Sequence, residues 1–131
     1  MGGIVAYASV LTYKNINSKR IKVTIAETDC AASSETAIPR LPRNGKIIRM
    51  KSVKSSGSAT KINPIIGNAT DPDGVNVVAE WTSDDDDKTT IDFMPGLTGA
   101  DFDCDGVLYH RSVPDAGTNN VITTEYLIER T

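Results

Sequence analysis

The segment RIKVTIAET, residues 20 to 28, alternates aliphatic and polar side chains along most of its length. Ile21, Val23 and Ile25 fall on one side of an extended chain, and Lys22 and Thr24 fall on the other. Successive side chains of a strand point to opposite faces of its sheet, so this period of two predicts a strand with one buried face. The segment therefore favours a β-sheet fold, and other parts of the chain repeat the pattern.

The same alternation recurs in seven other segments, which brings the expected number of strands to about eight. These segments are IVAYASVLTY, GKIIRMKSVKS, TKINPIIG, VNVVAEW, TTIDFM, GVLYHRS and NVITTEYLIE. In the last of them, Ile122, Tyr126 and Ile128 share one face, which we expect to be buried. Two further faces expected to point inward are Val75, Val77, Ala79 and Trp81 in VNVVAEW, and Thr89, Ile91 and Phe93 in TTIDFM.

The segment GKIIRMKSVKS combines the alternation with one irregularity. The pattern places Ile48 and Met50 on one side, and Arg49 and Lys51 on the other. Because Ile47 and Ile48 are consecutive aliphatic residues, they mark a candidate β-bulge.

Turn-forming residues such as Ser56-Gly57 and Asp105-Gly106 separate the expected strands. Pro64 has no backbone N–H to donate, so TKINPIIG is expected at a sheet edge or at a bulge. Short strands and turns in regular alternation predict an all-β fold, a single antiparallel β-sandwich or jelly-roll-like domain of about eight strands over residues 1–131. A chain of this length is expected to form one hydrophobic core.

The segment CAASSETAIPRLPRN, residues 30 to 44, is the longest irregular stretch. We expect a loop here, with one helical turn near Ser34 to Ala37, because Pro39 and Pro42 exclude a longer helix.

Composition narrows the class of protein. Hydrophobic residues make up 39% and charged residues 24%, and no apolar run reaches the roughly 20 residues of a membrane span. The apolar start of the chain lacks the basic residues of a signal peptide, so synthesis in a cytoplasm without export is expected. Cys30 and Cys104 are isolated thiols without metal-site spacing, and we expect them reduced, buried and inert.

A metal site is suggested by DFDCDGVLYH, residues 101 to 110, in which Asp101, Asp103 and Asp105 precede a glycine. An EF-hand loop starting at Asp101 would need an acid at its twelfth position, where Ser112 stands, and helices on both sides. A weak calcium site closed by another acid is the alternative to a simple turn at Asp105-Gly106. We predict the turn, no bound metal and no cofactor. The run Asp84–Asp87 is expected to be a solvated hairpin tip, because neighbouring side chains of an extended segment diverge.

Catalytic patterns are not apparent. His110 is the single histidine and has no serine or cysteine nucleophile beside it in a known motif, so we expect a surface or interface residue. No phosphate-binding loop or zinc spacing occurs. The sequence therefore predicts a protein that is not an enzyme.

Charge is distributed unevenly along the chain. Seven basic residues and no acid lie between Arg40 and Lys61, whereas eleven of the 17 acids lie between Asp71 and Asp105. Such blocks can form contacts between copies, or can neutralise each other inside one sandwich. Nucleic acid is not expected as a partner, because the basic block lacks interleaved aromatics and the net charge is −3. The residues expected at an interface are Arg40, Arg43, Arg49, Lys51 and Lys54.

The stretches GKIIRMKSVKSSGSATKINPIIG, TTIDFMPG and GVLYHRSVPDAGTNNVITTEYLIE resemble small all-β virion proteins of tailed bacteriophages, especially capsid decoration or cement proteins. The resemblance implies a non-enzymatic subunit, made in the host cytoplasm, that binds a major capsid or other virion protein in many copies. It also implies a homotrimer, which suits the local threefold positions of a capsid. The alternatives are a tail or head-fibre accessory subunit and a β-sandwich module that binds a glycan or receptor. Sugars stack on exposed aromatics, and Trp81 is expected on a buried face, which disfavours a glycan site.

Overall fold

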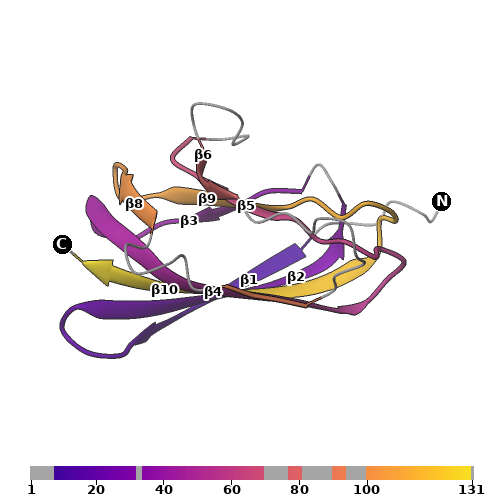
Figure 1. The fold of residues 1–131 in the computed structure, drawn as a ribbon, viewed down its shortest axis with the longest axis horizontal. Coiled ribbons are helices and arrows are strands. Elements are labelled where there is room, and N and C mark those ends of the chain that lie inside the picture. Colours follow the sequence, from indigo (N-terminus) through magenta and orange to yellow (C-terminus); the bar gives the residue numbers. More distant parts are fainter. Residues whose placement is uncertain (1–7, 32–33, 70–76, 81–89, 94–99, 131) are drawn as a thin grey trace.

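Two antiparallel β-sheets pack face to face in the computed structural model (Figure 1). The structure describes residues 8–31, 34–69, 77–80, 90–93 and 100–130. These residues contain ten strands and no helix, and thus no helix that could cross a membrane. The strands are β1 (Ala8–Asn15), β2 (Arg20–Cys30), β3 (Thr36–Ile38), β4 (Asn44–Ser56), β5 (Pro64–Gly67), β6 (Val77–Glu80), β7 (Thr90–Phe93), β8 (Ala100–Asp103), β9 (Leu108–Ser112) and β10 (Asn120–Arg130). The all-β prediction is confirmed.

The larger sheet has six strands in the order β1-β2-β10-β4-β7, and β8 also pairs with β4. β7 pairs with residues 50–53 of β4, and β8 pairs with residues 44–47 of β4. The two short strands therefore lie one after the other along the same edge of β4. The smaller sheet has the order β3-β9-β5-β6. In Figure 1 the larger sheet forms the lower layer and β3, β5 and β9 lie above it.

The core fills the space between the two sheets. Ile21, Val23 and Ile25 are at most 4% exposed, as the opening alternation predicts. Burying one aliphatic side chain of this size stabilises the fold by about 1.5–3 kcal/mol. The main core cluster consists of Ile21, Val23, Ile25, Ile38, Leu41, Ile47, Met50, Ile66, Phe102, Cys104, Leu108, Tyr126 and Ile128.

β4 contains the bulge that its doubled isoleucine predicts. Leu127 of β10 lies opposite Arg49, and Ile128 lies opposite Ile47, so Ile48 has no residue opposite it on β10. The extra residue shifts the alternation by one. Ile47 and Met50 are therefore the buried pair, and the prediction that Ile48 and Met50 share one side of the strand is wrong.

The segment 30–44 differs from its prediction. Thr36–Ile38 form β3 and pair with β9, with Thr36 opposite His110, so the predicted helical turn near Ser34 to Ala37 is wrong. Thr36 and Ile38 are buried, and this inward pair favours a strand over a helical turn. The short strands β3 and β8 are among those that raise the number above the expected eight.

β5 lies inside the smaller sheet, between β9 and β6, so the edge position predicted from its proline is wrong. The alternative prediction of a bulge agrees with the register shift between Ile66 and Gly67 where β5 pairs with β6. Pro64 is the first residue of the strand, where a missing N–H does not interrupt the ladder. Val77 and Ala79 of β6 are half-buried. Val75, Trp81, Thr89 and the run Asp84–Asp87 lie outside the described residues.

Candidate functional site

The aspartates of the suggested calcium loop lie on β8 and in the turn that follows it. Asp101 and Asp103 are exposed, and each faces a base of β4 or of the segment before it. Asp103 Oδ1 is 3.8 Å from Arg43 Nε, and Asp101 Oδ1 is 3.8 Å from Lys46 Nζ. Asp105 lies in the turn, next to Gly106 with φ of 88°. Within the described parts of the chain no three metal-ligating side chains are grouped.

The five predicted interface residues lie in three different places. Arg40 and Arg43 are exposed in the segment between β3 and β4. Lys54 donates from Nζ to the Gly57 carbonyl, 2.8 Å away, so its ammonium group is engaged in the turn after β4. Arg49 and Lys51 lie on the outer face of the larger sheet. On the outer face of the larger sheet the structure therefore brings together only Arg49 and Lys51 of the five.

A groove crosses this outer face beside Arg49 and Lys51. It has a volume of about 320 Å³ and is lined by Ile16, Lys22, Arg49, Lys51, Glu125 and Leu127. A smaller hollow of about 180 Å³ shares Lys51 and Glu125 with the groove and is also lined by Val53 and Thr123. Lys22 Nζ lies 4.0 Å from Glu125 Oε1. The groove thus combines three cations and one carboxylate with an aliphatic floor.

Exposed hydrophobic side chains border the same face. Val10 of β1 is 64% exposed and Ile16, in the turn after β1, is 46% exposed. Val10 aligns with Ala26 of β2, which aligns with Thr123 of β10 and then Val53 of β4, so an uncharged row crosses the sheet. Apolar patches rimmed by charges are characteristic of protein-binding surfaces.

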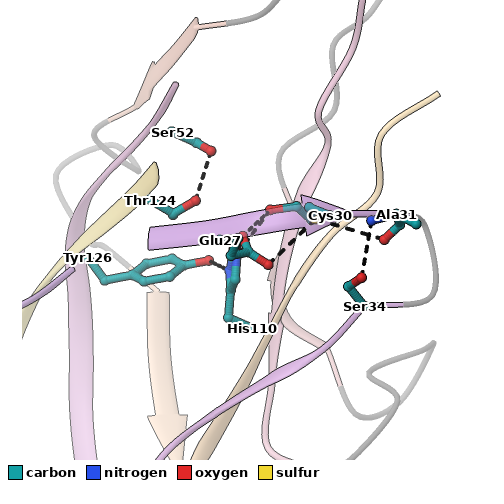
Figure 2. Close-up of polar contacts among 9 residues, drawn as sticks. Glu27, Cys30, Ala31, Ser34, Ser52, His110, Thr124 and Tyr126 are labelled. Atoms are coloured by element: carbon teal, nitrogen blue, oxygen red, sulfur yellow. Dashed lines mark hydrogen bonds and ion pairs between the residues drawn. The ribbon is translucent and has the colours of Figure 1, made fainter. Parts of the chain in front are cut away.

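A second cluster of polar side chains is buried between the sheets (Figure 2). Glu27 and Tyr126 come from the larger sheet, and His110 and Ser112 from the smaller one. His110 Nδ1 is 2.5 Å from the Tyr126 hydroxyl, and His110 Nε2 is 3.0 Å from both Glu27 Oε1 and Ser112 Oγ. All four side chains are fully buried. The prediction of a surface or interface histidine is therefore wrong.

The cluster joins the two sheets and does not have the geometry of a nucleophile triad. In a triad the serine and the carboxylate contact different nitrogens of the imidazole. Here both contact Nε2, and the Ser112 hydroxyl donates to Glu27 Oε1 at 2.8 Å. Because a carboxylate only accepts, Nε2 carries a proton and donates toward Glu27, while Nδ1 shares a hydrogen bond with the Tyr126 hydroxyl. Each group has a partner, so the cluster specifies how the sheets align.

Burial raises the pKa of the Tyr126 phenol in this cluster and of the Cys30 thiol beside it. Burial, with a contribution from the Glu27 carboxylate, raises the pKa of the Tyr126 phenol well above its ordinary value. The same two causes raise the pKa of the Cys30 thiol, whose Sγ is 3.6 Å from Glu27 Oε2. Cys30 and Cys104 are free and buried, as predicted.

The buried cluster was missed although the sequence contains its signal. Glu27 follows Ile21, Val23 and Ile25 at the same two-residue interval, so the alternation places it on the inner face. His110 likewise alternates with the buried Leu108. A charged residue at an inward position predicts a buried partner. For Glu27 this rule predicts a buried polar partner, and the structure places His110 there.

In comparisons with known proteins, no protein-family model matches the chain and no curated protein shows significant similarity to it.

Proposed function

We propose that this chain is a non-enzymatic virion structural protein, a capsid decoration or cement subunit that stabilises a phage head through protein–protein contacts. The observation that carries the proposal is the outer face of the six-stranded sheet, with its groove among Lys22, Arg49 and Lys51. The host cytoplasm would be the place of synthesis and the virion the final location.

The composition of this face supports docking to a protein. Arg49 and Lys51 supply charge for recognition, and Leu127, Val53 and Val10 supply apolar contact area. Interfaces of this mixed kind use charge for register and association rate, and apolar contact for affinity. The twisted surface of a broad sheet also suits a large partner better than a small ligand.

The two alternatives differ in how well this face supports them. A tail or head-fibre accessory subunit would use the same docking chemistry on another part of a virion. A glycan-binding module would need exposed aromatic rings. Among the described residues of the outer face none is aromatic, and Tyr13 lies on the inner side of β1 with its hydroxyl bonded to the Pro39 carbonyl. Protein docking is therefore the function we favour.

Binding to purified phage particles tests the proposal. The wild-type protein is expected to co-sediment with particles, and the double variant Arg49→Glu/Lys51→Glu is expected to bind more weakly, with a greater sensitivity to salt. The matched control is Arg40→Glu/Arg43→Glu, which changes the net charge equally in a different place and is expected to retain binding. Equal binding of both double variants would contradict the docking face. Absence of the native protein from virions would contradict the proposed function as a whole.

A further inference from the structure

Four side chains form a row straight across the outer face of the larger sheet. Lys14 of β1 lies opposite Lys22 of β2, Lys22 lies opposite Leu127 of β10, and Leu127 lies opposite Arg49 of β4. We refer to Lys14, Lys22, Leu127 and Arg49 as the cationic row. Like charges directly opposite each other on neighbouring strands destabilise a sheet. The pair Lys14 and Lys22 therefore costs the isolated domain stability.

A neighbouring row shows what a stabilising arrangement looks like on the same strands. Arg20, Glu129, Lys46 and Asp101 follow one another across β2, β10, β4 and β8 with alternating sign. Arg20 Nε is 3.1 Å from Glu129 Oε2, and Lys46 Nζ is 3.8 Å from Asp101 Oδ1. The cationic row has an aliphatic residue where this row has Glu129. Leu127, and not an acid, thus separates Lys22 from Arg49 in the cationic row.

The surroundings of the cationic row define what it can bind. Glu125, in the adjoining row, lies 4.0 Å from Lys22 and is the carboxylate of the groove lining. Leu127 and the 46% exposed Ile16 give the groove an apolar floor. A ligand that fits must carry separate negative charges and an aliphatic group. A nucleic-acid backbone fits less well, since its phosphates would pass Glu125 and the chain as a whole carries a net charge of −3.

We propose that the cationic row is the binding site for a short acidic segment of a partner protein, held in an extended conformation. Lys14, Lys22 and Arg49 pair with its carboxylates, and an aliphatic side chain of the segment packs on Leu127 and Ile16. The row spans three strand spacings, about 14 Å, which five extended residues cover at about 3.3 Å each. Acids at the first and fifth positions of the segment therefore reach both ends of the row. The inference rests on the proposed function, because the partner is the virion protein that the subunit decorates.

The first test uses the opposite effects that one substitution should have on stability and on binding. Lys14→Glu places an acid opposite Lys22 and gives the row alternating sign at that end. We expect a higher melting temperature than wild type together with weaker binding of an acidic peptide. Arg40→Glu makes the same change of charge outside the row and is expected to alter neither. A melting temperature of Lys14→Glu at or below that of wild type would overturn the assigned electrostatic cost, and unchanged peptide binding would overturn the site.

The second test measures binding by fluorescence anisotropy. The probe is a labelled peptide with Asp at its first and fifth positions, Leu at its third and Ser at its second and fourth, so that both acids and the leucine face the row. We expect saturable binding that weakens with salt and is roughly fivefold or more weaker for Arg49→Glu. The same peptide with Asn in place of both Asp residues, and a single-stranded oligonucleotide, are expected to bind far less. Equal binding of the Asn peptide, or tighter binding of the oligonucleotide, would overturn the assignment of an acidic protein segment. Failure of the Asp peptide with intact binding to particles would overturn this inference alone, whereas failure to bind particles would overturn the proposed function.

Discussion

At the scale of single residues, the buried cluster around His110 holds the two sheets together through polar contacts. Its four side chains come from both sheets and have no exposure to solvent. A buried polar group that loses its partner costs the full penalty of its desolvation. The cluster therefore makes stability sensitive to small changes at positions far from the proposed docking face.

Replacement of Tyr126 by phenylalanine measures this sensitivity. Tyr126→Phe keeps the packed ring and removes the hydroxyl that bonds His110 Nδ1, so we expect a loss of about 1–3 kcal/mol in the free energy of unfolding. Urea denaturation gives the value. The control Tyr109→Phe removes a hydroxyl from a half-buried ring in β9 and is expected to cost less than about 0.5 kcal/mol. Equal effects of the two substitutions would show that the cluster contributes nothing specific.

The raised pKa values of Cys30 and Tyr126 predict a loss of stability in alkali. The thiol and the phenol ordinarily release their protons near pH 9.0 and 10.0, and in the fold both pKa values are raised. The unfolded state then loses its protons first, so the free energy of unfolding falls as pH rises above about 9. Urea denaturation at increasing pH should show a shallower decline for Cys30→Ala and for Tyr126→Phe than for wild type. Identical slopes in all three proteins would contradict the two assignments.

Gly57 is required where the chain turns after β4. Its φ is 108°, and a Cβ at this position would lie 2.4 Å from Asn120 Oδ1, which accepts from the Ala59 amide. We expect Gly57→Ala to be clearly more destabilising than Gly106→Ala in thermal denaturation. Gly106 also has a positive φ, but a Cβ there would meet nothing closer than 3.5 Å, so the difference isolates the close approach. Equal melting temperatures of the two variants would contradict the contact with Asn120.

At the scale of elements, β4 shows how far sequence reasoning reaches. The strand and its bulge are readable from the alternation and from the doubled isoleucine. Which isoleucine points inward is decided by pairing with β10, because Ile128 aligns with Ile47 and bypasses Ile48. β3 is three residues long and is defined by its pairing with β9, which local sequence does not encode.

The candidate site was predictable only in part for the same reason. Arg49 and Lys51 were identified from their charge, whereas Lys14 and Lys22 join them through the register of three neighbouring strands. The charge distribution along the chain also gives Arg43 and Arg49 the same prediction of an interface position. In the structure, however, Arg43 faces Asp103 of the same molecule. Position in a sheet depends on pairing between distant segments, and composition along the chain carries little of that information.

The position of β8 beside β4 leads to a prediction about metal. Asp101 and Asp103 face Lys46 and Arg43, and these cations disfavour a divalent ion between the two carboxylates. Adding calcium or a chelator is expected to leave the melting temperature unchanged, since only a ligand of the folded state would raise it. A saturable rise with calcium that disappears in Asp103→Ala would contradict this prediction.

At the scale of the whole molecule, the two faces of the larger sheet differ in the side chains they carry. The inner face is mainly apolar, apart from the buried cluster and the hydrogen-bonded pair Ser52 and Thr124, and it packs on the smaller sheet, while the outer face carries the groove and the cationic row. A subunit with one recognition face can cover a symmetric surface in many copies, each in the same orientation.

A single docking face, as proposed above, is compatible with the homotrimer expected from the sequence resemblance. We expect static light scattering to give three times the mass of one chain, either for the free protein or for protein released from particles. Arg49→Glu/Lys51→Glu is expected to leave that mass unchanged, because we propose that the outer face binds the partner and not a second copy. A monomer under both conditions would contradict the trimer, and dissociation of the double variant would place the contact between copies on this face.

The position of β10 between β2 and β4 has a consequence for how the protein is made. Of the ten strands, this one is translated last, yet it fills the middle of the larger sheet and brings Ile128 opposite Ile21. Until it leaves the ribosome, β2 and β4 each have an open edge beside aliphatic side chains, and such edges attract chaperones and other nascent chains. Closure across so long a stretch of chain is slow. The sandwich therefore folds after translation of its last strand and not progressively during synthesis.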